Sequence, residues 1–309
     1  MTRTPRSLVA AALFALAMPL ATAAADPAPY ESPEAAVDAG IAALEARDRE
    51  GLLAVFGPEA EDVLFSGEAP RDREAWRSFL EAYRELSHVV VEDDGETAVL
   101  LIGTELWPFP APIVKGADGS WRFDPEAARE EVLARRIGEN ELAVIEIMRG
   151  YVAVQADYRL TDWDDDGVME FASAILSDPG ERNGLYWPPE DDAPESPIGD
   201  FVARAAADGY AIAGEAAAPE PFHGYYYRVL TGQGANAPGG ARSYLAGEDM
   251  VGGHALLAFP AAYGDTGIMS FMVGENGVVH EADLGEDTLE EAAAIDLYDP
   301  GPDWVPLVD

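Results

Sequence analysis

Apolar residues in the first half of the chain change from helical spacing to strand-like alternation. Ser32-Pro33 predicts the start of a helix, because Ser caps helix N-termini and Pro suits the first helical position. Apolar residues at helical spacing predict further helices up to about residue 86. Strand patterns then flank turns at Asp93-Asp94-Gly95 and Asp118-Gly119. Helices followed by antiparallel hairpins predict an α+β domain over residues 32–125.

A second α+β pattern follows from residue 126. The chain is helical in pattern to about residue 160, and Gly138 permits a break after which Asn140 could cap a longer helix. Asn276-Gly277 is a strong hairpin signal between two late strands. We therefore expect a domain over residues 126–298 in which a long helix packs on an antiparallel sheet, and an extended tail over 299–309. The expected buried face of the helix includes Leu142, Ile145, Met148, Val152 and Gln155. The expected strands cover residues 222–231, 255–259, 268–273 and 278–282.

The first 25 residues have the order of a cleavable secretory signal peptide. Arg3 and Arg6 precede an apolar run, and small residues close it, at either Ala21-Thr22-Ala23 or Ala23-Ala24-Ala25. The run is too short to span a bilayer as a helix of about 20 residues. We expect cleavage, a short linker over residues 26–31, and a periplasmic or secreted product without a stable membrane anchor.

Composition narrows the possible partners. The chain has 309 residues, no cysteine, and 58 acidic against 19 basic side chains, which gives a net charge of −39. Such a surface repels nucleic acid and anionic lipid, so neither is an expected partner. The acidic surface is either a hydrated surface without a specific partner or a surface that binds a specific cationic partner. Without cysteine, disulfides and thiol catalysis are excluded.

A run of alternating acids after the long helix is the best candidate site. Asp162, Asp164 and Asp166 precede Gly167, as in the first half of a calcium loop, with the Val168 carbonyl as a further oxygen. A complete loop carries Glu at its twelfth position, but here that residue is Ser173, so Glu170 would have to close the site. The alternative is an acidic turn without a metal. Ca²⁺ is the candidate cofactor of this loop, and no organic cofactor is expected.

No catalytic constellation appears in the sequence. The nucleophile elbow, the P-loop and the zinc motif H-E-x-x-H are all absent, and four histidines stand apart from one another. Aromatic residues suggest a binding surface for a glycan or a partner protein, with core packing as the alternative. Its expected members are Tyr186, Trp187, His223, Tyr225 and Tyr227.

Three functional hypotheses remain open at this point. The first is a non-enzymatic binding or assembly protein of the cell envelope, with an envelope protein or glycan as partner. The second is an envelope hydrolase that uses carboxylates and His223 near Tyr186 and Trp187. The third is a calcium-dependent stability switch without a further ligand.

Several long stretches resemble an exported bacterial family known as domain of unknown function family 2950. The resemblance implies two subdomains and no established activity. It covers most of the chain in order, through "SPEAAVDAGIAALEARD", "WPFPAPIVK" with "WRFD", "RRIGENELAVIEIMRGYVAVQADY", "NGLYWP", "FHGYYYRVLTGQG" and "AYGDTGIMSFMVGENGVVHEADLG".

Two fold-level likenesses accompany it. The order of elements over residues 32–125 resembles the cone-shaped fold of nuclear transport factor 2 relatives. The second half resembles the globular domain of type IV pilins and pseudopilins, through a helix with the pattern "YVAVQADY" ahead of an antiparallel sheet. The apolar helix that builds pilin filaments has no counterpart here, so this resemblance does not extend to filament assembly.

Overall fold

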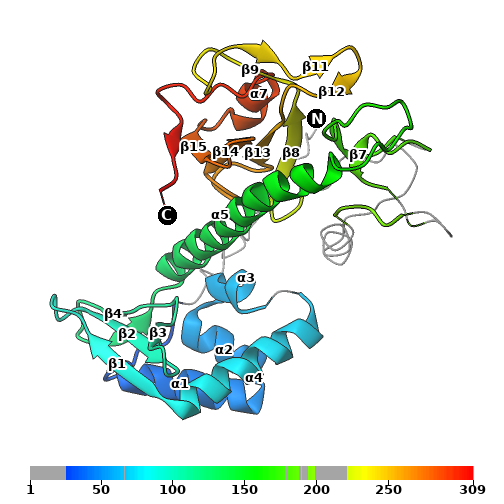
Figure 1. Cartoon of the computed structure of the whole chain (residues 1–309). Coiled ribbons are helices and arrows are strands. Elements are labelled where there is room, and N and C mark those ends of the chain that lie inside the picture. Colours follow the sequence, from blue (N-terminus) through cyan, green and yellow to red (C-terminus); the bar gives the residue numbers. More distant parts are fainter. Residues whose placement is uncertain are drawn as a thin grey trace, which may run out of the picture. The chain divides into compact units, whose positions relative to one another are not determined.

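The protein is mixed α+β, as the sequence predicts. The computed structural model describes residues 26–65, 67–178, 180–187, 189, 194–198 and 221–308 (Figure 1). The expected signal peptide over residues 1–25 lies outside this range. The described chain forms two compact units, one up to Glu131 and one from Val132 onwards. The boundary lies inside helix α5 (Pro125–Tyr158), six residues after the boundary expected at 125.

Unit 1 places helices against a small antiparallel sheet. Ser32 caps α1 as predicted, since its hydroxyl accepts a hydrogen bond from the Ala35 amide at 3.2 Å. The strand order is β1-β2-β4-β5, with β3 also paired to β2. The helices are α1 (Pro33–Ala46), α2 (Arg49–Phe56), a 3₁₀ turn (Pro58–Ala60), α3 (Glu61–Leu64) and α4 (Ala69–Glu85). The strands are β1 (Ser87–Val91), β2 (Thr97–Ile102), β3 (Trp107–Pro108), β4 (Ile113–Lys115) and β5 (Trp121–Phe123).

The core of unit 1 joins these helices to the sheet. Phe56 from α2 lies against Phe123 from β5, with ring centroids 4.2 Å apart. Leu100 and Ile113 from the sheet belong to the same buried cluster. The predicted hairpin is confirmed, because β1 and β2 pair antiparallel and the Asp94 carboxylate accepts the amides of Glu96 and Thr97 within its turn.

Unit 2 is built on a five-stranded antiparallel sheet in the order β16-β15-β14-β13-β8. The Asn276-Gly277 hairpin between β14 and β15 is confirmed, and Gly277 has the positive φ of 73° that such a turn requires. The expected tail contributes β16, which pairs with β15. The sheet strands are β8 (Tyr225–Leu230), β13 (Ala255–Pro260), β14 (Met269–Gly274), β15 (Val279–Asp283) and β16 (Val305–Pro306).

Both faces of this sheet are covered. Leu256 and Ala258 of β13 share a buried cluster with Val144 and Met148 of α5, whereas Leu257 shares a second cluster with α7. This alternation follows from the two-residue period of a strand. Figure 1 shows α5 on one side, and α7 with β9, β11 and β12 on the other. The remaining elements are β6 (Ala174–Leu176), β7 (Gly184–Tyr186), β9 (Gly232–Gln233), β10 (Arg242–Ser243), β11 (Leu245–Ala246), β12 (Asp249–Met250) and α7 (Thr288–Ala293).

Helix α5 differs from the sequence prediction in two ways. It is one continuous helix of 34 residues, so the expected break at Gly138 does not occur. Asn140 caps nothing, because its side-chain amide donates to the Thr266 carbonyl at 2.9 Å in the turn between β13 and β14. Met148 and Gln155 of the expected face are fully buried, but Leu142 is 67% exposed. The other buried residues of the helix face are Val144, Tyr151 and Tyr158.

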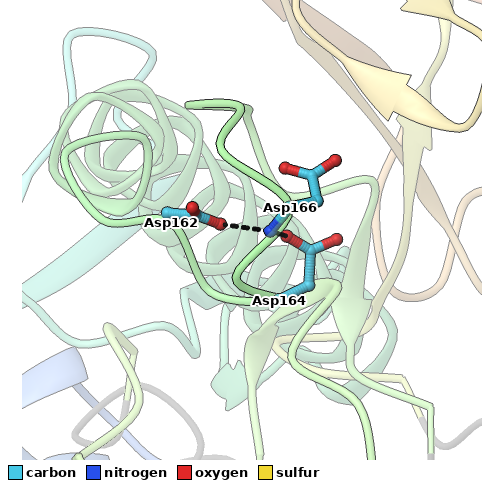
Figure 2. Close-up of side chains that lie close together, drawn as sticks. All are labelled: Asp162, Asp164 and Asp166. Carbon is cyan, nitrogen blue, oxygen red and sulfur yellow. Dashed lines mark hydrogen bonds between the residues drawn. The ribbon is translucent and has the colours of Figure 1, made fainter.

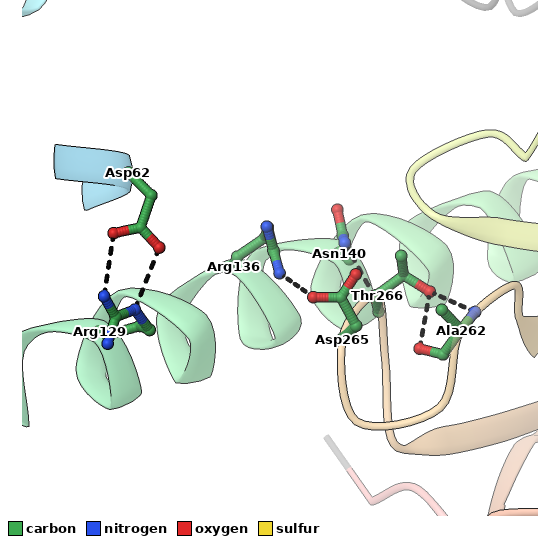
Figure 3. A network of polar contacts seen from close by, with 7 residues as sticks. All are labelled: Asp62, Arg129, Arg136, Asn140, Ala262, Asp265 and Thr266. Atoms are coloured by element: carbon green, nitrogen blue, oxygen red, sulfur yellow. Dashed lines mark hydrogen bonds and ion pairs between the residues drawn. The ribbon is translucent and has the colours of Figure 1, made fainter. Parts of the chain in front are cut away.

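The Thr266 contact belongs to a row of polar contacts along α5 (Figure 3). Arg136 forms an ion pair with Asp265, one helical turn before Asn140. One carboxylate oxygen of Glu141 accepts the amides of Ile268 and Met269, each at 2.9 Å. Within unit 1, Arg129 near the start of the helix pairs with Asp62 at 3.0 Å. None of the helices in the described ranges is both long and apolar enough to cross a membrane.

Candidate functional site

The alternating acids fold into one tight loop directly after α5. Ligand-type oxygens of Asp162, Asp164 and Asp166 all lie within 4.8 Å of one another. Asp162 is half-buried, and the other two are exposed. Figure 2 shows the three carboxylates around a single turn of the backbone. The structure therefore brings together the three aspartates that the sequence singled out.

The loop is shaped by its own side chains. Asp162 accepts the amides of Asp166 at 3.2 Å and Gly167 at 2.9 Å, and Asp166 accepts the Val168 amide at 2.7 Å. Asp165 and Gly167 have positive φ values of 63° and 89°. Asp and Gly are among the residues that tolerate this backbone region, so the sequence suits the turn.

The loop is anchored at its start by an aromatic contact. The Trp163 indole donates to the Tyr158 carbonyl at the end of α5, at 2.9 Å. Its ring lies edge-on to Trp187, with centroids 4.8 Å apart. Trp163 thus ties the acidic loop to the core of unit 2.

The loop is anchored at its end by a buried amide. Gln155 of α5 is fully buried, and its side chain exchanges two hydrogen bonds with the backbone of Ala172, each at 2.9 Å. The Phe171 amide also donates to the Met250 carbonyl at 2.9 Å. These contacts hold both ends of the loop, and such support keeps a binding site in place.

Glu170 does not join the three aspartates. Its Oε2 accepts the Met250 amide from β12 at 3.1 Å, which directs that oxygen toward β12. Burial raises the pKa of Glu170, and the nearby carboxylates of Asp164 and Asp249 raise it further. Asp249, which the sequence analysis did not single out, is thus a further acid beside the loop.

The surroundings of Asp164 disfavour its ionised form. Desolvation and the neighbouring carboxylates of Asp166 and Asp162 raise the pKa of Asp164 above its ordinary value. A raised carboxyl pKa means that the folded chain binds a proton more readily than the unfolded one. A bound cation would reverse this preference, because it favours the ionised form.

The five expected aromatic binding residues do not form one surface. Trp187 is only 5% exposed and Tyr225 is fully buried, and both belong to the core beneath α5. Tyr186 and Tyr227 are half-buried at the edge of that core, and His223 is exposed. Core packing therefore accounts for Trp187 and Tyr225.

His223 lies in a turn and not in the expected strand. It has a φ of 47°, Gly224 follows with 73°, and the flanking residues Phe222 and Tyr225 exchange two backbone hydrogen bonds. Positive φ at both central residues is typical of a type I′ turn, which the His-Gly pair permits. His223 consequently lies ahead of β8, which begins at Tyr225.

A buried histidine, His254, lies close to the end of the loop. His254 is 1% exposed and lies against the rings of Tyr151 and Phe171, with centroids 5.2 and 4.7 Å away. Burial lowers its pKa to about 4, and the charge of Arg159 adds to this effect. Its Nδ1 has no hydrogen-bond partner within the described part of the chain. In the sequence, the apolar residues that follow His254 in "GGHALLAF" are the signal that indicates its burial.

Comparison with known proteins gives one match. No curated protein and no solved structure matches this chain. The likenesses to nuclear transport factor 2 relatives and to pilins therefore stay predictions. The family described as "Protein of unknown function (DUF2950)" matches residues 28–307, nearly the whole chain. The chain belongs to this family, as the stretches quoted from its sequence predict.

Proposed function

We propose that this protein is a non-enzymatic binding protein of the bacterial cell envelope, stabilised by Ca²⁺ at the loop 162–170. The single observation that carries the calcium part is the convergence of Asp162, Asp164 and Asp166 within 4.8 Å. Ca²⁺ is a hard cation that prefers carboxylate and carbonyl oxygens, about six to eight of them, and waters can complete the set. The Val168 carbonyl and Glu170 are the further protein ligands that we propose.

Charge and location both support this assignment. Three clustered carboxylates in a chain of net charge −39 repel one another, and a divalent cation removes that repulsion. Export through residues 1–25 would expose the loop to extracellular calcium, where modules bind with Kd values of about 10⁻⁴–10⁻³ M. Glu170 would close the site through Oε1, because Oε2 already accepts the Met250 amide.

The environment of His223 favours binding over hydrolysis. Hydrolysis of a glycan or peptide bond by acid–base chemistry needs convergent proton-transfer groups, such as a pair of carboxylates. Among the described residues that line the hollow beside His223, Glu146 is the one carboxylate, and it is exposed and paired with Arg149 at 3.1 Å. Trp187, which the hydrolase hypothesis placed at the site, is in the core.

Terbium luminescence together with calorimetry tests the calcium site. Trp163 lies between two proposed ligands in the sequence, so a lanthanide bound in the loop should be excited through its indole. We expect a luminescence signal that Ca²⁺ displaces, and binding heat at millimolar Ca²⁺. The double variant Asp164→Asn with Asp166→Asn should abolish both signals.

Asp165→Asn is the matched control. It removes one charge from the same loop but none of the three clustered carboxylates, and Asn tolerates the positive φ of 63° at this position. It should retain binding within about threefold. No heat at millimolar Ca²⁺, or an equal loss in the control and the double variant, would contradict the calcium assignment.

Export and partner choice need separate measurements. Sequencing the N-terminus of the protein from an envelope fraction should give a start near Asp26. An intact Met1 in the cytoplasmic fraction would contradict export.

A partner, which we propose to be an envelope protein or a glycan, should be recovered with calcium and lost with a chelator if the loop supports the binding surface.

A further inference from the structure

Unit 2 holds an apolar pocket beside α5, with a volume of about 560 Å³. We call it the α5 pocket. Its wall on the helix runs through Ala143, Ile147, Gly150, Tyr151 and Val154, which recur at the spacing of one helix face. Outside α5, the described lining comes from strands β6, β7, β8 and β13 and from loop residues, with Ile175, Leu185, Tyr227, Leu256 and Ile198 among them. Small-molecule sites fall in the range of about 300–1,000 Å³, so the size suits a single ligand.

The interior of the pocket is suited to an apolar body. The two tyrosine hydroxyls of the lining are engaged by the protein, since Tyr151 donates to the Ala255 carbonyl and Tyr227 to the Phe222 carbonyl, at 3.2 and 3.3 Å. Glu146 and His223 are the charged or titratable side chains of the described lining, and both are exposed. A ligand would therefore bury an apolar part and keep a polar head near these two residues.

The net charge of the protein limits which polar head group a ligand of this pocket can carry. A net charge of −39 opposes the approach of an anion, and the carboxylate of Glu146 stands at this site. Because Glu146 is already paired with Arg149, it does not require a cationic ligand. We propose that the α5 pocket binds an uncharged amphiphile, with an aliphatic or aromatic body and a hydrogen-bonding head. This site goes beyond the proposed calcium loop and does not depend on it.

Glycine on the helix makes the proposal testable. A Cβ built on Gly150 would meet no atom within 4 Å outside its own helix backbone and chain neighbours. Because Gly150 lines the pocket, we expect a larger side chain there to extend into it. Gly138 lies on the same helix with the same open space, but it is not among the lining residues. Both changes to Leu favour helix formation, so neither should unfold the chain.

The experiment measures fluorescence of the uncharged probe N-phenyl-1-naphthylamine bound to the wild-type chain, Gly150→Leu and Gly138→Leu, with and without a calcium chelator. We expect Gly150→Leu to weaken binding by about tenfold or more, and Gly138→Leu to change it by less than about twofold. Decanol should displace the probe at least about tenfold better than decanoate, since the chain length is shared and only the head charge differs.

Three results would overturn the proposal. They are no probe binding to the wild-type chain, equal effects of the two leucine variants, and stronger displacement by decanoate than by decanol. Circular dichroism of both variants checks that the fold is retained. Failure of the calcium proposal shows separately, as missing terbium and calorimetric signals, so the two proposals are distinguished by their readouts.

Discussion

At the residue scale, Glu170 is both a hydrogen-bond acceptor in the fold and a proposed ligand of Ca²⁺. Burial and the carboxylates of Asp164 and Asp249 raise its pKa, while its Oε2 accepts the Met250 amide. A raised carboxyl pKa stabilises the fold at pH values below the ordinary value, and this contribution is lost as pH rises through the folded value. Above the folded value the ionised side chain therefore destabilises the calcium-free fold.

Glu170→Gln should separate these roles, because the amide oxygen can still accept the Met250 hydrogen bond. In chelator at pH 7 the variant should unfold at the same temperature as the wild-type chain or at a higher one. In millimolar Ca²⁺ it should gain less stability than the wild-type chain, since one proposed ligand charge is lost. Thermal unfolding followed by circular dichroism measures both, and an equal gain from calcium would remove Glu170 from the ligand set.

His254 makes the second prediction at this scale. Burial among Tyr151 and Phe171, together with the charge of Arg159, lowers its pKa from 6.5 to about 4. The stabilising contribution of the neutral imidazole is therefore complete above about pH 6.5 and declines as pH falls toward about 4. The loss is on the order of 3 kcal/mol by the lower pH.

His254→Phe should flatten the dependence of unfolding free energy on pH in that window, because Phe fills the aromatic site without titrating. Urea unfolding at intervals from pH 7 to pH 4 measures the slope. If the variant keeps the wild-type slope, another group must cause the acid sensitivity of the fold.

At the scale of elements, α5 is fastened to the turn between β13 and β14. Glu141 accepts two successive amides there, from Ile268 and Met269. Asn140 donates to the Thr266 carbonyl in the same turn, and Arg136 pairs with Asp265. Hydrogen bonds to a charged acceptor contribute more than neutral ones. The helix is thus held at the sheet by polar contacts as well as by its apolar face.

Glu141→Ala should lower the unfolding free energy by about 1–3 kcal/mol, because two amides lose their shared acceptor. Glu141→Gln should lower it less, since one acceptor oxygen remains. Glu139→Ala, an exposed acid on the same helix, is the control and should stay within about 0.5 kcal/mol of the wild-type value. Equal effects of Glu141→Ala and Glu139→Ala in urea unfolding would show that the turn contacts contribute no stability.

At the scale of the whole molecule, charge dominates. With a net charge of −39 the folded chain repels itself, and salt screens this repulsion because the Debye length falls from about 30 Å at 0.01 M to about 3 Å at 1 M. Sodium chloride over this range should raise the melting temperature by several degrees. The rise should continue up to molar salt and should not level off at millimolar salt, because screening has no binding site to fill. Calcium should act at millimolar concentrations in the wild-type chain and lose that effect in the double variant Asp164→Asn with Asp166→Asn. A melting temperature that is unchanged or lower in salt would contradict self-repulsion.

The sequence determined the features that depend on neighbours along the chain. The Ser32 cap, the turn at Asn276-Gly277 and the turn of Asp162, Asp164 and Asp166 form through hydrogen bonds that span five residues or fewer. Family membership follows equally from the order of its motifs. Such features are predictable because each local group has few competing partners.

Only the tertiary structure decided which distant groups meet. Glu170 bonds to an amide 80 residues away, and Glu141 to amides 127 and 128 residues away, so neither partner can be read from local spacing. The burial of Trp187 and Tyr225 and the open space at Gly150 depend in the same way on packing between α5 and the sheet. Packing of apolar surface is nondirectional, and the sequence alone does not specify which residues close a core and which line a pocket.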